Sequence, residues 1–513
     1  MAFEHVLENF PFHHLYLCLS ISFLIFLYKW LSPFHDASKN KPPSPQKLPI
    51  LGNLHQLGKL PHRSLRLLSQ KHGELMLIYI GSKPTIVASS ANVAQEIMKT
   101  HDVIFSNRPQ LKVACKILYD GKDLAFSNYG EYWRQMKSLC MLNVFSNTKV
   151  RSFRGVREEE ATLMMEKIRR LSLSEKAVNL SEIFLSLSND VICRAAFGRK
   201  YTGEEGCANL KELLGDFSEA LGTFCMQDFV PWLGWVDKFT GVERKAEKVA
   251  RALDEFIEKV VQEHLDLPNS ETNITNEINT QEKLQSFVDI LLEIQRENSS
   301  ALPKESVKAI LLDMLAGGTD TTYTLLEWAM TELLTHPEVM KQLQDEVRDI
   351  SKPKLKVYED DLKNMKYLKA VMKETLRLHP PLPLLLFRES SRDVKIKGYE
   401  IAGKTQVIIN AWAIQRDSTY WEEAEEFKPE RFLNSSIDFK GQDFEFIPFG
   451  AGRRGCPGMS FGVIDAELML ATLVYEFNWK LPEEQNFNVI ESSGTTVRKR
   501  DPLLAIATPL SNK

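Results

Sequence analysis

The sequence has few cysteines for its length, and they form no pattern typical of a zinc site or of a disulfide-bonded scaffold. Seven cysteines are scattered over 513 residues, and no two are spaced as Cys-x-x-Cys. This usage is typical of a chain kept in a reducing compartment, where most single cysteines are small buried hydrophobes. Only Cys456 stands in an unusual sequence context.

The chain also lacks an excess of charge and a nucleotide fingerprint. Its net charge is −4, with 43% hydrophobic and 26% charged residues, which are ordinary values for a globular protein. Binding to nucleic acid is driven by clustered Lys and Arg, so this charge gives no reason to expect it. A Gly-rich Rossmann motif after a strand is absent as well. We therefore expect a small-molecule or protein partner and no nucleic acid.

Charge is missing altogether from one N-terminal segment. Between Asn9 and Tyr28 there is no Asp, Glu, Lys or Arg, and the length suits one tilted span of a bilayer. Glu4 and Glu8 precede the segment and lysines follow it, which is the reverse of a cleaved signal peptide and places the following chain on the cytosolic side. A signal peptide, a buried core helix and a monotopic surface helix are the alternatives. We expect an uncleaved membrane anchor over residues 1–31.

A proline-rich segment follows the apolar one. Residues 32–53 include Pro42, Pro43 and Pro45, and prolines fix φ and remove backbone donors, which gives a stiff, extended connector. We expect a hinge here. Beyond it the sequence shows no repeat period and no second linker, so residues 54–513 are expected to form one domain.

The pattern within that domain predicts a mainly α fold with small β-sheets. The β-rich runs at 75–80 and 85–89, separated by Gly-Ser-Lys-Pro at 81–84, predict a hairpin. Most of the stretch 131–376 has helical spacing, and residues 405–410 form another β-type run.

Glycine is concentrated around one cysteine near the C-terminus. Residues 448–458 read Pro-Phe-Gly-Ala-Gly-Arg-Arg-Gly-Cys-Pro-Gly, and such density lets the backbone approach a large planar ligand. The charges of Arg453 and Arg454, and the dipole of a helix expected just after Cys456, favour a thiolate, the form of cysteine that binds haem iron. The alternative is a glycine-rich turn around an inert cysteine.

This segment resembles the haem-binding signature of the cytochrome P450 family, Phe-x-x-Gly-x-Arg-x-Cys-x-Gly, which is filled by Phe449, Gly452, Arg454, Cys456 and Gly458. The resemblance implies a cytochrome P450 fold preceded by an N-terminal transmembrane helix, with haem b as the cofactor. It implies that Cys456 is the axial ligand of the iron, that Phe449 packs near the sulfur and that Arg454 pairs with a haem propionate.

A possible charge network connects two further segments. Glu374 and Arg377 are three residues apart and therefore on one face of a helix, where such a pair is usually a solvated surface ion pair. The run Phe-Lys-Pro-Glu-Arg-Phe at 427–432 resembles the family's Pro-Glu-Arg-Phe segment. That resemblance implies that Arg431 joins Glu374 and Arg377 in a buried structural network.

A long helical pattern, residues 306–335, carries an irregular centre. Ala-Gly-Gly-Thr-Asp-Thr-Thr at 316–322 breaks helix propensity with two glycines and several polar side chains. A kink with locally bonded threonines is the alternative. The run resembles the family's oxygen-activating segment, which implies that Thr321 bonds the oxygen at the iron and that Asp320 relays protons from solvent.

Two more elements resemble haem-contacting positions of the family. Trp133, Arg134 and Lys137 lie in a segment similar to the helix that contacts a haem propionate, although Lys137 stands where the family often has Arg and loses the bidentate fork. Arg388 also matches a family position that contacts haem.

The similarity extends over essentially the whole chain and is closest to microsomal plant members of specialised metabolism. Matching positions imply a mostly apolar substrate cavity, suited to a neutral lipophilic ligand, although core packing is the alternative for each residue. The implied lining is Ala114, Ile117, Leu118, Ala316, Pro383, Leu384, Leu385, Gly494 and Thr495.

These resemblances imply that residues 54–513 form a haem-thiolate monooxygenase domain on the cytosolic face of the endoplasmic reticulum membrane, held by a single span. The reaction expected is insertion of one atom of O2 into a lipophilic terpenoid, phenolic or alkaloid. Its electrons would come from NADPH through a flavoprotein reductase in the same membrane. The alternatives are a haem-thiolate dehydratase or isomerase that needs no external electrons, a non-catalytic haem carrier or sensor, and an enzyme that uses Cys456 as a nucleophile without haem.

Overall fold

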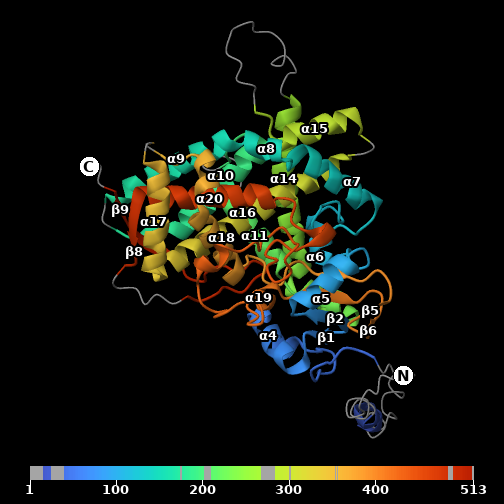
Figure 1. Cartoon of the computed structure of the whole chain (residues 1–513). Helices are drawn as coiled ribbons and strands as arrows, with labels where there is room; N and C mark the ends of the chain where they lie inside the picture. Colours follow the sequence, from blue (N-terminus) through green and yellow to red (C-terminus); the bar gives the residue numbers. More distant parts are fainter. Residues whose placement is uncertain are drawn as a thin grey trace.

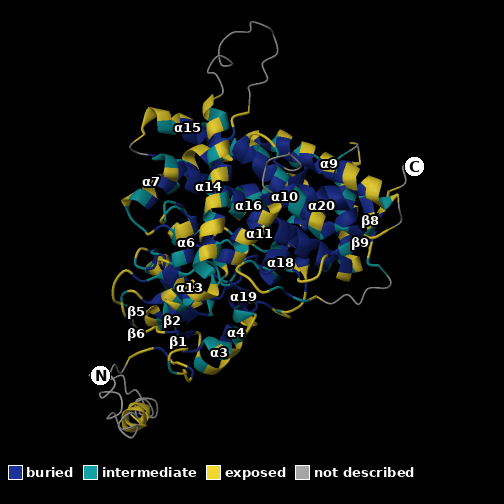
Figure 2. Cartoon of the chain, turned by 180° about the vertical axis from the view of Figure 1, so that it is seen from behind, coloured by how far each residue is buried: buried dark blue, intermediate teal, exposed yellow. Residues whose placement is uncertain are grey.

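The apolar run around residue 315 forms one helix, α16 (Lys304–Thr335), which starts two residues before the expected 306–335. It is apolar on nearly every side and buried along most of its length, because a helix without a polar face has no side to expose to water. Helix α10 (Leu180–Phe197) packs along it. Gly318 permits this close packing, because a Cβ atom there would lie only 2.7 Å from Cγ1 of Ile192. Figure 2 shows both helices in the buried interior.

The computed structural model describes residues 16–24, 40–173, 176–201, 210–266, 284–299, 302–352, 354, 356–482 and 489–510. These residues confirm the mainly helical fold class with small sheets (Figure 1). Besides α10 and α16, the helices are α3 (Leu54–Leu57), α4 (Pro61–His72), α5 (Ala91–Gln95), α6 (Lys112–Ile117), α7 (Glu131–Leu139), α8 (Asn147–Ser152), α9 (Arg154–Ser172), α11 (Leu210–Leu221), α12 (Met226–Phe229), α13 (Val236–Thr240), α14 (Val242–Asp266), α15 (Phe287–Glu297), α17 (Pro337–Ser351), α18 (Lys366–Leu378), α19 (Ala411–Ile414) and α20 (Met459–Glu476). Short helical turns are η1 (Glu96–Thr100), η2 (Cys140–Val144), η3 (Pro231–Leu233), η5 (Glu359–Asn364), η6 (Pro429–Phe432) and η7 (Gly452–Arg454).

The strands form small sheets at opposite ends of the helical block (Figure 1). The largest has the order β1-β2-β7-β4, a second has the order β3-β9-β8, and β5 pairs with β6. Their bounds are β1 (Leu75–Ile80), β2 (Lys83–Ala88), β3 (Val178–Asn179), β4 (Arg388–Glu389), β5 (Val394–Ile396), β6 (Tyr399–Ile401), β7 (Gln406–Ile409), β8 (Phe477–Lys480) and β9 (Leu504–Pro509).

The expected hairpin is present, but its turn is shorter than the predicted separator 81–84. β2 begins at Lys83, and Pro84 lies opposite Tyr79 inside the hairpin. The proline is tolerated because β2 pairs with β7 only from Thr85 onward, so the missing N–H of Pro84 removes no bond to β7.

None of the described helices is long and apolar enough to cross a membrane. Of the expected anchor at 1–31, only residues 16–24 are described, and they are helical; the rest lies outside the described residues. The described part of the hinge is bonded to the body, since the carbonyl of Asn40 accepts from the amide of Glu400 and that of Pro43 from the amide of Leu77, both at 2.8 Å.

Candidate functional site

The glycine-rich segment forms a tight loop that presents Cys456 just before helix α20. Gly450 and Gly452 have φ angles of 68° and 67°, where glycine is strongly favoured. A Cβ atom at Gly452 would collide with the carbonyl oxygen of Met98. The amide of Cys456 donates to the carbonyl of Phe449 at 3.0 Å, which closes the loop. The expected helix after the cysteine is α20, which starts three residues later, at Met459.

The thiol of Cys456 faces a space inside the fold. Its side chain is accessible, yet burial is the largest influence on its pKa and raises it. An accessible sulfur surrounded by protein must border an internal opening. Hydrogen bonds from the amides of Gly458 and Met459 and the charge of Lys137 act in the opposite direction and lower the pKa, so they favour a thiolate.

The centre of α16 offers a second accessible surface within an otherwise buried helix. Gly317 is exposed and a Cβ atom there would meet nothing within 4 Å, so its side of the helix borders open space. The hydroxyl of Thr321, one turn later on the same face, donates to the carbonyl of Gly317 at 2.5 Å. Asp320 is partly buried, and its Oδ1 lies 3.8 Å from Nη1 of Arg498.

Arg454 is held rigidly beside Trp133. Its Nε donates to the carbonyl of Ser106 at 2.7 Å, Nη1 to that of Leu124 at 3.1 Å, and Nη2 to that of Ser127. The guanidinium carbon lies 4.3 Å from the centre of the Trp133 ring. Backbone carbonyls therefore accept from all three nitrogens of the side chain that was predicted to pair with a propionate.

Three buried guanidinium groups gather on this side of the site. Arg108, Arg388 and Arg454 are all at most 9% exposed, and the pKa of Arg108 is lowered first by burial and then by the charges of Arg454 and Arg388. Asp102 accepts from Arg388 at 3.4 Å, whereas burial raises the pKa of Asp123 to about 6. Positive charge is therefore in excess within the cluster.

Lys137 and Arg134, on α7, are placed differently from one another. The Lys137 ammonium donates to the carbonyls of Arg453 and Gly455, the latter at 3.2 Å, next to the cysteine loop. Arg134 is exposed and lies over the ring of Tyr129, with its guanidinium carbon 5.7 Å from the ring centre.

The predicted charge network has the expected partners. Both Glu374 and Arg377 are fully buried, and two nitrogens of Arg377 donate to the two oxygens of Glu374 at 2.7 and 2.8 Å. Nε of Arg431 donates to Glu374 at 3.0 Å. Arg377 also donates to the carbonyls of Gln415 and Ala424, so the network joins α18 to the loops before the cysteine segment.

The predicted substrate-lining residues come from four parts of the fold. Those on α6 are buried, Ala316 on α16 is half-buried, those after α18 are buried or half-buried, and those in the loop 492–498 are exposed. They are Ala114, Ile117 and Leu118; Ala316; Pro383, Leu384 and Leu385; and Gly494 and Thr495.

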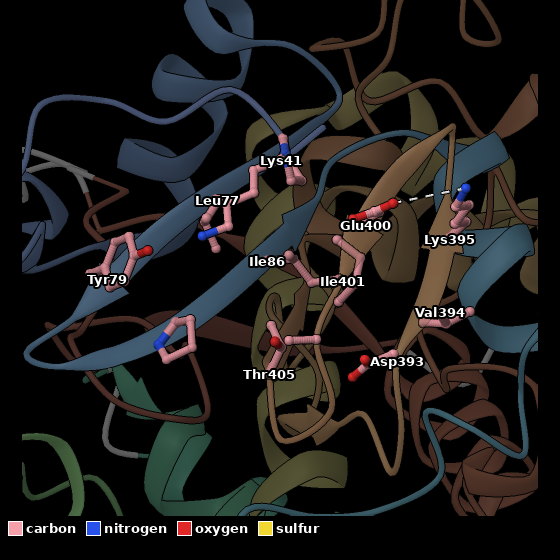
Figure 3. A pocket seen from close by; sticks show the side chains of 13 residues that line it. Lys41, Leu77, Tyr79, Ile86, Asp393, Val394, Lys395, Glu400, Ile401 and Thr405 are labelled. Atoms are coloured by element: carbon pink, nitrogen blue, oxygen red, sulfur yellow. Dashed lines mark ion pairs between the residues drawn. The ribbon is translucent and has the colours of Figure 1, made fainter. Parts of the chain in front are cut away.

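A separate open pocket of about 700 Å³ lies at the sheet end of the domain, beneath the hinge (Figure 3). Strands β1 and β2, the β5–β6 hairpin and the hinge form its walls, and Lys395 on its rim lies 3.9 Å from Glu400. It contains none of the predicted site residues. The lining is Lys41, Pro42, Leu77, Tyr79, Pro84, Ile86, Asp393, Val394, Lys395, Glu400, Ile401, Ala402 and Thr405.

The residues around Cys456 fit a haem. An accessible thiol that receives hydrogen bonds from two backbone amides, which oppose the effect of burial on its pKa, is a suitable iron ligand. The open face at Gly317 leaves room beside α16, and the excess positive charge of Arg108, Arg388 and Arg454 suits two acidic propionates. Cys456 would hold the iron, and the arginine cluster would hold the acidic edge of the cofactor.

Sequence reasoning missed Asp102, Arg108, Asp123 and Asp313. Arg108 donates to the carbonyls of Ala125, Leu386 and Phe387, and Asp102 bonds both Arg388 and the backbone of Arg453. A signal existed only for Asp313, an acid within the apolar run 309–315 of a helix that is buried on most sides.

Comparisons with known proteins agree with this site. The family model described as cytochrome P450 matches residues 42–506. The chain is 52% identical over 498 residues to cytochrome P450 736A117 of Prunus mume, covering 95% of this chain and 94% of the relative. It is 49% identical over 509 residues to cytochrome P450 71A6 of Nepeta racemosa, covering 96% and 98%. It is also 49% identical over 488 residues to norfluorocurarine oxidase of Strychnos sp., covering 94% and 95%.

Proposed function

The chain belongs to the cytochrome P450 family and is therefore a haem monooxygenase; we propose that it inserts one atom of O2 into a lipophilic plant secondary metabolite. The substrate class is a terpenoid, a phenolic or an alkaloid, and the electrons come from NADPH through a separate flavoprotein reductase. The accessible thiol of Cys456 inside the fold is the observation that carries this proposal. A relative named norfluorocurarine oxidase supports an oxidation.

Residues of the cysteine loop and residues of α16 have different roles in this proposal. When bound, the haem supplies the iron at which O2 is reduced with two electrons and two protons. Cys456 would hold the iron, and hydrogen bonds from the amides of Gly458 and Met459 favour the ionised sulfur, in opposition to burial, which raises its pKa. On α16, the Thr321 hydroxyl borders the open face at Gly317 and delivers a proton there, and Asp320 passes protons inward from the surface.

The apolar residues of α6 and of the segment after α18 form the substrate cavity in this proposal. Neutral side chains such as Ile117, Leu118 and Leu385 provide dispersion contacts and exclude water, but offer no charge to bind a polar substrate. Ala316 is small enough to leave room next to Gly317. A lipophilic substrate is favoured for these reasons.

The catalytic domain is proposed to lie on the cytosolic face of the endoplasmic reticulum membrane, anchored by residues 1–31. Support comes from the uncharged run 9–28 with lysines after it. A second support is an exposed apolar group on η3 and α13, where Trp232, Trp235 and Phe239 are 61%, 59% and 82% exposed. Removing residues 1–31 should make the protein extractable with alkaline carbonate; extraction of the full chain under the same conditions would contradict the anchor.

Turnover with purified reductase tests the reaction. We expect a lipophilic substrate to be oxygenated only when NADPH and reductase are both present, with one product formed per NADPH consumed. Product formed at full rate without them would instead show a dehydratase or isomerase, and substrate-independent NADPH use without product would favour a carrier or sensor. A purified protein without a haem absorbance band would leave the nucleophile alternative.

Thr321→Val tests the role of the hydroxyl with little change in shape. We expect the valine variant to consume NADPH while releasing peroxide, with product per NADPH falling about 10-fold or more, in the range of a lost general acid. Thr321→Ser, which keeps the hydroxyl, is the matched control and should retain most of the yield. Equal yields in both variants would rule out proton delivery by Thr321.

A further inference from the structure

Two acidic side chains beside the site have no role in the proposed reaction. Asp313 lies one turn before Gly317 on the same face of α16, and its Oδ2 accepts from the amide of Leu124 at 2.6 Å. Asp123, which is fully buried, accepts from the amide of Phe126 at 2.7 Å through Oδ2. Its Oδ1 has no hydrogen-bond partner among the described residues.

The surroundings of these two carboxyl groups disfavour two negative charges. Burial is the largest cause of the raised pKa of Asp313, and the charge of Asp123 is the next largest. Burial raises the pKa of Asp123 to about 6, although the charge of Arg108 lowers it. Three other titratable groups that interact with the pair, Tyr132 on α7, Cys140 on η2 and Cys115 on α6, have raised pKa values and stay neutral, whereas Arg454 adds a positive charge near Asp123. Arg108 and Arg454 are therefore the cations that act on Asp123.

Both carboxyl groups bind one short stretch of backbone, residues 124–127. The amides of this stretch donate to Asp313 and Asp123. Its carbonyls accept from side chains of the haem site. Leu124 accepts from Trp133 and Arg454, Ala125 from Arg108, and Ser127 from Arg454. Any movement of the stretch away from α16 would therefore disturb the groups that hold the acidic edge of the cofactor.

We propose that Asp123 and Asp313 position residues 124–127 against Arg108, Arg454 and Trp133 through these amide hydrogen bonds, and that one of the two carboxyl groups stays protonated at neutral pH. With one charge on the pair, Arg108 balances it and both amide bonds persist. Loss of the second proton at alkaline pH places two anions in the same buried space, and their repulsion loosens the stretch. Asp123 and Asp313 are thus positioning residues, which act on the haem site through the backbone.

The number of protons released on unfolding tests whether one of the two carboxyl groups is protonated. The unfolded chain ionises both aspartates at pH 7, so a pair that holds one proton in the folded state releases it on unfolding. Proton release should be measured with a pH indicator in weak buffer on full-length holoenzyme in detergent. The variants are Asp313→Asn, Asp123→Asn and the double variant, because Asn keeps an oxygen to accept from the backbone amides.

Asp313→Asn and the double variant should each release about one proton fewer than the wild type, whereas Asp123→Asn should release about the same number, because burial still holds the proton on Asp313. A decrease of about two in the double variant would show two independent protonated acids. No decrease in either single variant would show that neither holds a proton. Both results would overturn the proposal.

Asp465→Asn is the matched control, since Asp465 is another buried acid of raised pKa, on α20. Its effect on proton release should add to that of the pair. If an asparagine variant fails to fold, the infrared carbonyl band of protonated carboxyl groups in the wild type provides the second measurement. Titration of that band through pH 5–9 must show a step that the pair accounts for, and a wild type without such a step would also overturn the proposal.

Haem retention tests the positioning. The pH at which half of the haem is lost on the alkaline side should move upward by about one unit or more in Asp313→Asn, because the second charge cannot form. Asp313→Leu, which cannot accept from Leu124, should lose haem faster at every pH. An unchanged alkaline midpoint in Asp313→Asn would overturn the positioning role. The haem-retention test rests on the proposed function, but the proton-release test does not. The two tests can therefore fail separately.

Discussion

Trp133 and Arg454 donate to the same carbonyl oxygen, that of Leu124, at 3.0 and 3.1 Å, while the guanidinium of Arg454 lies over the Trp133 ring. One backbone oxygen thus joins α7 to the cysteine loop. The flat guanidinium is required here because it must stack on a ring and reach several carbonyls at once, which an ammonium group cannot do.

Arg454→Lys should therefore release most of its haem and lower the free energy of unfolding by about 2 to 4 kcal/mol, since buried carbonyls lose their donors. Urea unfolding and the haem-to-protein absorbance ratio measure these effects. Arg453→Lys is the control, because Arg453 is half-exposed and its side chain bonds the side chains of Asp102 and Tyr129, not the buried carbonyls that Arg454 binds. Equal losses in the two variants would argue against a special role for the Arg454 fork.

Glu374→Gln should destabilise the fold strongly without touching the cofactor site. Glu374 is the only acid paired with Arg377 and Arg431 among the described ion pairs, and a neutral amide leaves two guanidinium groups without a counter-charge. We expect a cost of about 3 to 5 kcal/mol, because Arg377 is fully buried. Removal of an exposed pair in Lys352→Ala should change the denaturation midpoint very little, because solvent screens the two charges. Similar denaturation midpoints for both variants would contradict a buried network.

Features that depend on one short stretch of sequence could be predicted from the sequence, whereas contacts between residues that are distant in the sequence could not. The glycines around Cys456 and the helical spacing at 306–335 are local, and both correspond to the structure. Arg108 and Asp102 carry no such signal, because their partners near residues 125, 387 and 453 are distant in sequence and only the fold brings them together. Asp313 is the one polar residue in the apolar run 309–315, which was a local signal for it.

The two adjacent glycines of α16 should respond oppositely to alanine. A Cβ atom at Gly318 would be pressed against Ile192 of α10, whereas one at Gly317 meets open space. Gly318→Ala should therefore cost about 1 to 3 kcal/mol of stability. Gly317→Ala should raise helix stability by up to about 1 kcal/mol and reduce the space for substrate next to Thr321.

Thermal unfolding and substrate affinity measured on both variants separate these effects. The double variant Gly318→Ala/Ile192→Ala should recover part of the stability lost in Gly318→Ala, because the smaller side chain makes room for the new methyl group. No recovery, or a loss of stability in Gly317→Ala as large as in Gly318→Ala, would show that the helix backbone and not the contact with α10 requires glycine.

Asp465 lowers the stability of the fold in a pH-dependent way, at a position away from the haem site. It lies on α20 and is 2% exposed, and its Oδ1 has no partner among the described residues. Burial raises its pKa from 3.8 to about 7, while the charge of Arg157 acts in the opposite direction and Glu359 and Glu160 raise it further.

Asp465→Asn should remove this pH-dependent loss of stability. Because the pKa of Asp465 is raised in the folded state, the folded chain holds a proton between about pH 4 and pH 7 that the unfolded chain has lost. The contribution of Asp465 to the free energy of unfolding therefore falls as the pH rises from about 4 to about 7, and it is constant above that pH. The asparagine variant should therefore match the wild type near pH 4 and be more stable at pH 7 and above. Unfolding midpoints at pH 5, 6, 7 and 8 measure the difference. The control variant Asp360→Asn, at an exposed position, should show no such trend. A stability difference between Asp465→Asn and the wild type that stays constant with pH would mean that Asp465 is ionised throughout, stabilised by Arg157.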